Sequence, residues 1–130
     1  MAGKCGRAVA LVADYINKTA EAREFISGWE STIQFDLYGE EPFNLLFLQT
    51  GKVEFRGGKA LDPDVVFFCN SDLFFDILTG KIDQDQAFSD GLVQIKGSIF
   101  DSVRFRHAAE IVQQKHSTLF NVLRTFSRFT

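Results

Sequence analysis

Apolar residues recur with the spacing of a helix near the start of the chain. They follow one another at intervals of three, four and four: Val9, Val12, Ile16 and Ala20. Asp14 and Lys18 lie between them, so residues 7–28 predict an amphipathic helix with one buried face. We expect this helix to break near residues 17–19, where Thr19 can cap a second segment.

After residue 28 the period changes from that of a helix to that of strands. The stretch STIQFDLYG, residues 31–39, alternates apolar and polar side chains, as a half-buried strand requires. The stretch FNLLFLQTGKVEF, residues 43–55, predicts two further strands. A tight turn at Thr50-Gly51 joins them, because glycine can take a positive φ there.

A loop separates these three strands from the next one. Residues 56–64, RGGKALDPD, have no periodicity and contain a Gly-Gly pair and a proline. The following stretch VVFFCN, residues 65–70, is apolar on both faces, which predicts a strand that is covered on both sides. A fifth strand is expected at LVQIKGS, residues 92–98.

The stretch SDLFFDILTGKIDQDQAF, residues 71–88, predicts two short helices. Ser71 or Asp72 can cap the first helix, and Gly80 supplies its left-handed end. The second helix is a short turn over residues 83–88.

From residue 99 onward the chain has no Pro and no Gly, and its apolar spacing predicts one long helix or two. The order of elements predicts an α+β fold, with a five-stranded, mixed and mostly antiparallel sheet covered by helices on one face. At 130 residues and 45% hydrophobic content, the chain is long enough to close one core. We expect a single domain over residues 1–130, with an extended C-terminal helix at about residues 115–130.

Charge and hydropathy exclude several classes of protein. A formal net charge of -3 with 24% charged residues gives no electrostatic footprint for nucleic acid. No apolar run approaches the roughly 20 residues that span a bilayer. The apolar run near the N-terminus is also too short for a secretory signal, so we expect a soluble, cytoplasmic protein.

Candidate catalytic and metal-binding residues are few. His107 and His116 lie nine residues apart, which does not fit the spacing of a helical metal pair. Cys5 and Cys69 have no histidine nearby in sequence, and no G-x-S-x-G motif is present. We therefore expect no metal, no cofactor and no enzymatic activity. The unusual count is 15 phenylalanines, which favours either a large dry core or an apolar cavity.

One run of motifs lies between residues 64 and 98. It consists of the strand DVVFFCN, the Ser71-Asp72 cap, an apolar helix ending Thr79-Gly80-Lys81, the pair Ala87-Phe88, and GLVQIKGS. In order and spacing this run resembles the sterol carrier protein (nonspecific lipid transfer) domain family, and the similarity covers about residues 30–112. The resemblance implies an apolar tunnel between the sheet and the helices. In that family, fatty acids, acyl-CoA, sterols or phospholipids bind there without chemical change.

The resemblance also implies which residues would line such a tunnel. They are Phe74, Phe75, Leu78, Phe88, Phe100 and Val103. Gly80 would let the chain turn sharply at the rim. From the residues alone, ordinary core packing explains each phenylalanine equally well. Lys81 could meet a lipid carboxylate or phosphate, although a favourable charge at a helix C-terminus is the better explanation.

The chain departs from the family's pattern in two places. Asp83-Gln84-Asp85 stands where the family often has a proline, and a helix-like tail continues over residues 115–130. A heptad-like stripe runs into this tail: Phe105, Ala109, Val112, His116, Leu119, Leu123 and Phe126. Such a helix could cover the tunnel, pair with a second subunit as a homodimer, or make weak contact with a membrane surface. Self-packing and dimerisation rank above the membrane, because three positive charges from residue 115 onward are few for a lipid surface.

The leading hypothesis is therefore a non-catalytic protein that binds and transfers lipids in an apolar tunnel. An interaction or dimerisation module, its core filled by its own phenylalanines, is the first alternative. An enzyme acting on an acyl substrate is the second and weaker one.

Overall fold

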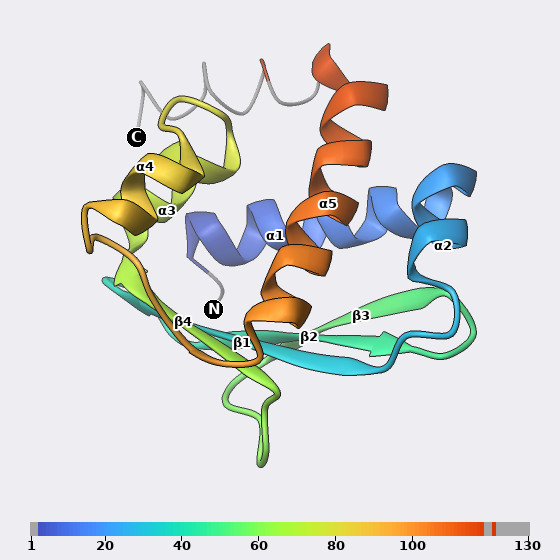
Figure 1. The fold of residues 1–130 in the computed structure, drawn as a ribbon, viewed down its shortest axis with the longest axis horizontal. Coiled ribbons are helices and arrows are strands. Elements are labelled where there is room, and N and C mark those ends of the chain that lie inside the picture. Colours follow the sequence, from blue (N-terminus) through green and yellow to red (C-terminus); the bar gives the residue numbers. More distant parts are fainter. Residues whose placement is uncertain (1–2, 119–120, 122–130) are drawn as a thin grey trace.

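Helices cover one face of a five-stranded sheet (Figure 1). The structure is a computed structural model and describes residues 3–118 and residue 121. Its strands are β1 (Ser31–Tyr38), β2 (Phe43–Leu48), β3 (Lys52–Gly57), β4 (Val65–Asn70) and β5 (Gln94–Gly97). Its helices are α1 (Lys4–Lys18), α2 (Ala20–Ile26), α3 (Ser71–Leu78), α4 (Gln84–Ser89) and α5 (Ile99–Lys115).

The strands lie in the order β3-β2-β1-β4-β5. β1 is central, and it pairs antiparallel with β2 and parallel with β4. The pairs β2–β3 and β4–β5 are antiparallel. In this register Ile33 lies between Leu45 on one side and Val65 on the other. The predicted α+β fold, with a mixed and mostly antiparallel sheet, is confirmed.

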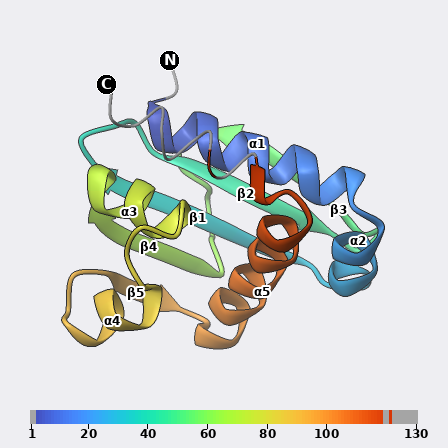
Figure 2. The ribbon, with the colours of Figure 1, turned by 90° about the horizontal axis from the view of Figure 1, so that it is seen from above.

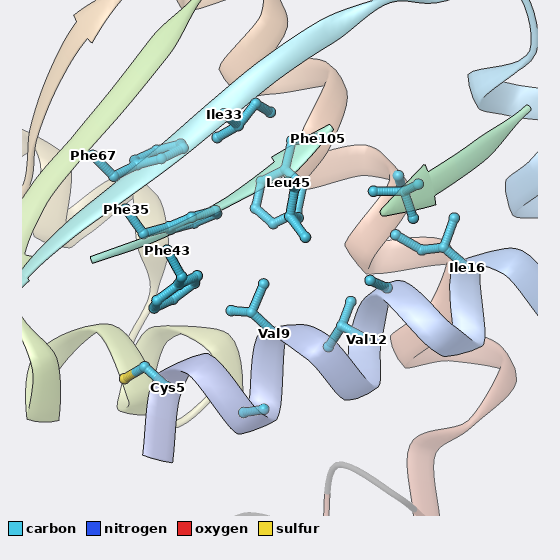
Figure 3. Close-up of a cluster of buried hydrophobic side chains, with 14 of the residues drawn as sticks. Cys5, Val9, Val12, Ile16, Ile33, Phe35, Phe43, Leu45, Phe67 and Phe105 are labelled. Atoms are coloured by element: carbon cyan, nitrogen blue, oxygen red, sulfur yellow. The ribbon is translucent and has the colours of Figure 1, made fainter. Parts of the chain in front are cut away.

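The core forms where α1 packs on the covered face of the sheet. Val9, Val12 and Ile16 of α1 are fully buried and point toward the strands (Figure 3). The facing strands supply large apolar side chains, among them Phe35, Phe43 and Leu45, which are also buried. The helical spacing of α1 and the alternation of β1 therefore bring their apolar faces together, as the sequence predicts.

The first helix breaks where its sequence predicts, since α1 ends at Lys18 and α2 begins at Ala20. The expected role of Thr19 is wrong, because its hydroxyl caps no amide of α2. That hydroxyl donates instead to the carbonyl oxygen of Tyr15, one turn back, at 2.6 Å. A threonine hydroxyl can make this local bond as readily as a cap.

Two side chains fix α1 at its ends. At the N-terminus, the Glu40 carboxylate accepts hydrogen bonds from the amides of Cys5, at 3.2 Å, and Gly6, at 2.9 Å. Near the C-terminus, the Asn17 amide group donates to the Val53 carbonyl and accepts from the Val53 amide, at 2.8 and 2.9 Å. Because β3 is an edge strand, the Asn17 side chain replaces one strand partner there.

Three local expectations differ from the structure. Asn70, rather than Ser71 or Asp72, caps α3, because its side-chain oxygen accepts from the amides of Asp72 and Leu73. β5 is shorter than residues 92–98 and covers only Gln94–Gly97. β4 is covered on one face and not on both, since Phe67 is buried whereas Phe68 is 36% exposed on the other face.

The last described helix, α5, ends at Lys115, and His116 follows as its C-cap. The His116 ring packs on Tyr15 with ring centroids 4.6 Å apart, and its Nε2 lies 3.1 Å from the Thr19 hydroxyl. These contacts fasten the end of α5 to the junction of α1 and α2. The extended helix expected at about residues 115–130, with Leu119, Leu123 and Phe126 of its stripe, lies mostly outside the described residues.

Candidate functional site

A cleft of about 380 Å³ lies between α3 and α5, above β4. Figure 2 shows α3 and α4 on one side and α5 on the other, with the sheet below them. The lining residues come from β4, α3, the α3–α4 segment, α4, the approach to β5, and α5: Phe67, Phe74, Ile77, Leu78, Gly80, Ile82, Asp83, Gln84, Val93, Phe105, Arg106, Ala109, Glu110 and Gln113. Cavities of about 300–1,000 Å³ are typical of small-molecule sites.

The base of the cleft is aromatic. Phe67, Phe74 and Phe105 line it, and all three are buried. Each ring also packs on Phe35 of β1, with centroids 5.4, 5.4 and 5.7 Å apart. A base of phenylalanine rings offers no hydrogen-bond partner, so it suits the apolar part of a ligand.

The rim of the cleft is polar and centres on Arg106. Its guanidinium donates to both oxygens of Asp85, at 2.5 and 3.1 Å, and its Nε donates to Glu110 at 3.1 Å. The hydrogen bond with Asp85 raises the pKa of Arg106 above its ordinary value, so the guanidinium stays charged. Since Arg106 belongs to α5 and Asp85 to α4, this ion pair joins the two helices across the rim.

A smaller cavity of about 210 Å³ lies beyond Arg106. It shares Gln84, Val93 and Arg106 with the cleft. Exposed apolar side chains surround it, including Phe88 at 48% and Val103 at 42% exposure. The Arg106–Asp85 pair therefore stands between the cleft with its aromatic base and an exposed apolar surface.

A wider hollow lies away from the helices, beside Tyr38 and Phe68, with a volume of about 550 Å³. It is more open to solvent than the cleft, and Asp36, Glu40 and Lys59 contribute to its lining. It therefore encloses an apolar ligand less well than the cleft does.

The structure divides the six residues that the family resemblance implies at a tunnel wall. Phe74 and Leu78 line the cleft, whereas Phe88 and Val103 line the smaller cavity. Phe75 is buried away from both, with the Lys4 ammonium 5.1 Å from its ring centroid. Phe100 is 74% exposed and lines neither cavity. The expected common lining is thus not formed by Phe75 and Phe100, and the ligand-binding role of the set stays a prediction.

Phe75 and Phe100 lie outside both cavities because of their positions on α3 and α5. Phe74 and Phe75 are adjacent in α3, and neighbouring helical positions point about 100° apart. Phe74 faces the sheet and the cleft, so Phe75 faces α1 instead. Phe100 stands in the first turn of α5, before the helix reaches the cleft at Phe105.

Sequence reasoning missed Phe67, Phe105 and Arg106 as residues of the site. Phe105 was assigned to the stripe of the C-terminal helix, and Phe67 to a strand expected to be buried on both faces. The signal for Phe67 is its place two residues after Val65, which puts both side chains on the covered face. No local signal identifies Arg106, because its partner Asp85 lies 21 residues earlier in the chain.

The end of α3 shapes the rim. Gly80 has φ of +81° and lines the cleft, so the sharp turn expected at this glycine is confirmed. The next residue, Lys81, is exposed and lines neither the cleft nor the smaller cavity. A role for Lys81 in holding a lipid head receives no support from this placement.

Both cysteines lie outside the cleft and are free thiols. The Cys5 thiol is fully buried and donates to the Ser71 carbonyl at 3.0 Å, and burial raises its pKa well above the ordinary value. Burial also raises the pKa of Cys69 to about 11. Thiols with raised pKa values are poor nucleophiles at neutral pH.

The residues that the structure describes, 3–118 and 121, hold neither a candidate metal site nor a candidate membrane span. Within these residues, no group of three or more His, Cys, Asp or Glu side chains is placed to hold a metal ion. No described helix combines the length and apolarity that crossing a bilayer requires.

Comparison with known proteins gives one family and several solved structures. A family model described as the SCP-2 sterol transfer family matches residues 12–110. Comparison with curated protein sequences gives no match. The sterol carrier protein domain 2 of Helicoverpa armigera is 19% identical with a TM-score of 0.65, and the match covers 84% of this chain and 87% of that one.

Two other solved structures show how the same fold is used in chains of different length. The protein titled UbiJ-SCP2 ubiquinone synthesis protein is 16% identical with a TM-score of 0.65, over 84% of this chain and 91% of that chain. The sec-alkylsulfatase Pisa1 from Pseudomonas sp. is 18% identical with a TM-score of 0.56, over 68% of this chain but 14% of that enzyme. At these identities the likeness is one of fold.

Proposed function

Because this chain belongs to the SCP-2 sterol transfer family, we propose that it binds a lipid in the cleft between α3 and α5 and carries it without chemical change. The observation that supports the proposal most directly is the cleft itself, an apolar cavity of about 380 Å³ under the helices of a fold used for lipid transfer. The apolar tail of the ligand would lie on Phe67, Phe74 and Phe105.

The energetics of such binding are those of apolar burial. Each methylene group that leaves water contributes about 0.8 kcal/mol before ordering costs. The base of the cleft consists of rings that make no directional bonds. It therefore discriminates between ligands by the size of the apolar tail and not by the chemical groups of that tail. Fatty acids, acyl-CoA, sterols and phospholipids are all ligands to test, and an isoprenoid quinone joins them because one neighbour is titled a ubiquinone synthesis protein.

The exposed apolar residues beside the smaller cavity give the ligand a route. Phe88 and Val103 line that cavity, and Ile99 and Phe100 lie next to Val103 on the first turns of α5. All four are exposed, so they can contact the membrane or protein that supplies the lipid. We propose that the tail passes from this surface into the cleft when the Arg106–Asp85 pair opens.

The predicted cytoplasmic location and homodimer stay predictions. The dimer would depend on the helix expected at about residues 115–130, of which residues 119–120 and 122–130 lie outside the described part of the chain.

The first test of the proposal is binding by the delipidated full-length protein. Native mass spectrometry of the protein as purified, followed by organic extraction, would identify any lipid that it carries. Titration with each lipid class should then give saturable binding and a higher melting temperature, because a ligand that binds only the folded state stabilises it. Absence of saturable binding of every class at micromolar concentrations would refute the proposal.

A pair of tryptophan variants tests whether the cleft is the binding site. Ala109→Trp places a large ring in the lining of the cleft on α5, and we expect it to abolish lipid binding. Ala20→Trp makes the same change at an exposed position on α2 and should leave binding unchanged. Circular dichroism melts of both variants check that they fold. Unchanged binding by folded Ala109→Trp would place the ligand elsewhere.

A further inference from the structure

We propose that the cleft selects lipids whose polar head carries no negative charge, and that it binds them in preference to free fatty acids and other anionic lipids. This inference rests on the function proposed above and specifies its ligand class. It follows from the charges at the rim.

Carboxylates outnumber cations where a lipid head would lie. Asp83 and Glu110 line the cleft, and Asp85 lines the smaller cavity beside it. Among the residues that the structure describes, Arg106 is the only Lys or Arg in either lining. Three negative charges therefore face one positive charge.

The single guanidinium is already paired with two carboxylates, through three of its five N–H groups. Two of its N–H groups bond both oxygens of Asp85, and its Nε bonds Glu110. A bidentate arginine–carboxylate pair is among the stronger charge-assisted interactions. A lipid carboxylate or phosphate would have to displace one of these partners or share the guanidinium with both, and in either case the two acids stay nearby as like charges.

Asp83 adds a negative charge that Arg106 does not neutralise. Its carboxylate accepts the Asp85 amide at 2.8 Å as the cap of α4, which holds it at the rim. An anionic head at this place meets like charge, which is unfavourable. A hydroxyl head instead finds carboxylate acceptors in Asp83 and Glu110, and the amides of Gln84 and Gln113 can donate to a carbonyl or ether oxygen.

The nearest other cations do not change this balance. Lys81 is exposed and lies outside both linings. Lys96 is also exposed, and it lines a hollow that adjoins the smaller cavity through Phe88, Val93 and Ile95. His107 is also outside both linings, and its Nδ1 lies 3.5 Å from Glu110. None of these three side chains lines the cleft or the smaller cavity.

The test compares two ligands with the same tail. Dodecanol and laurate each carry 12 carbons and differ in the charge of the head. Calorimetric titration of the delipidated full-length protein at neutral pH, below the concentration at which laurate forms micelles, should give at least about tenfold tighter binding of dodecanol, a ratio that corresponds to roughly 1.4 kcal/mol. Binding of laurate as tight as that of dodecanol would overturn the inference and leave lipid binding intact. If neither ligand binds, the inference is overturned, whereas the proposed function fails only if every lipid class in the earlier titration also shows no saturable binding.

A charge variant tests whether the rim carries the selectivity. The double variant Asp85→Asn/Glu110→Gln leaves Arg106 without anionic partners, so the affinity for laurate relative to that for dodecanol should rise about tenfold over the wild type. Asp62→Asn/Asp90→Asn removes the same net charge at exposed positions outside both linings, and it should leave both affinities unchanged. An unaltered ratio of the two affinities in the rim variant, with dodecanol still bound, would also overturn the inference.

Discussion

Gly97 in β5 lies where any side chain would collide with the backbone of a neighbouring segment. Its φ is +102°, a conformation that L side chains rarely adopt. A Cβ at this position would collide with the carbonyl oxygen of Asp64. Both effects come from the close approach of β5 to the segment before β4, where Gly97 is the register partner of Val65.

A series of three glycine substitutions separates these two effects. Gly57→Ala, with neither strain nor a neighbour within 4 Å, should hardly change the free energy of unfolding. Gly58→Ala, with φ of +86° and open space around it, should cost about 1–2 kcal/mol from backbone strain alone. Gly97→Ala adds the collision and should cost about 3 kcal/mol or more. Urea unfolding at pH 7 measures all three, and equal effects at Gly58 and Gly97 would contradict the role of the collision.

The two cysteines make stability depend on pH in the alkaline range. Burial raises the pKa of Cys69 from an ordinary 9.0 to about 11, and it raises the pKa of Cys5 as well. Above pH 9 the unfolded chain loses thiol protons that the folded chain keeps, so the free energy of unfolding falls as the pH rises from 9 to 11. Below pH 9 this contribution is fully present.

The double variant Cys5→Ala/Cys69→Ala checks this pH dependence. Wild type should lose more stability than the variant when the pH is raised from 8 to 11, and the difference should vanish between pH 6 and 8. The two proteins are compared by the slope of the free energy of unfolding against pH. Absolute values would mislead, because Cys5→Ala also removes the hydrogen bond to Ser71 and lowers stability at every pH. Parallel slopes above pH 9 would show that the thiols do not contribute.

Among the elements, α1 is attached to the sheet by polar contacts as well as by its apolar face. The Asn17 side chain makes two hydrogen bonds with the backbone of Val53, in the edge strand β3. Loss of a partner leaves partly buried backbone groups unsatisfied, which costs more than the bond itself contributes. We expect Asn17 to hold the C-terminal half of α1 over β3.

Replacing Asn17 measures this attachment. Asn17→Ala should lower the free energy of unfolding by about 1–3 kcal/mol, because two backbone groups of β3 lose their partner. Lys18→Ala, one residue away and pointing into solvent, should have little effect. Hydrogen exchange gives a second readout, since the Val53 amide should exchange faster in the Asn17 variant alone. Equal stabilities of the two variants would contradict a structural role for Asn17.

At the scale of the whole molecule, the fold could be predicted from the sequence because periodicity reports burial. The alternation in β1 and the helical spacing in α1 predict these elements directly, whereas the break near Thr19 was inferred from a cap that does not form. The family resemblance rested on motifs such as the helix ending Thr79-Gly80-Lys81, and the match of the SCP-2 sterol transfer family over residues 12–110 confirms it. These signals are local, so a single chain is enough to read them.

The site was harder to predict because it is assembled from distant segments. Periodicity marks Phe105 and Phe67 as buried but does not show that they share one cleft with Phe74. The pairing of Arg106 with Asp85 depends on how α4 and α5 approach each other, which no spacing within either helix encodes. The capping residue of α3 was also predicted wrongly, because Asn70, Ser71 and Asp72 are all chemically able to cap this helix.

The cleft is built entirely from the second half of the chain. Every residue that lines it lies between Phe67 and Gln113, whereas α1, α2 and the first three strands precede residue 58. A protein is synthesised from its N-terminus, so this first half emerges from the ribosome before any part of the cleft exists. The nascent chain can enclose a lipid tail there only after α5 has emerged, which makes loading of cargo an event that follows translation of the domain.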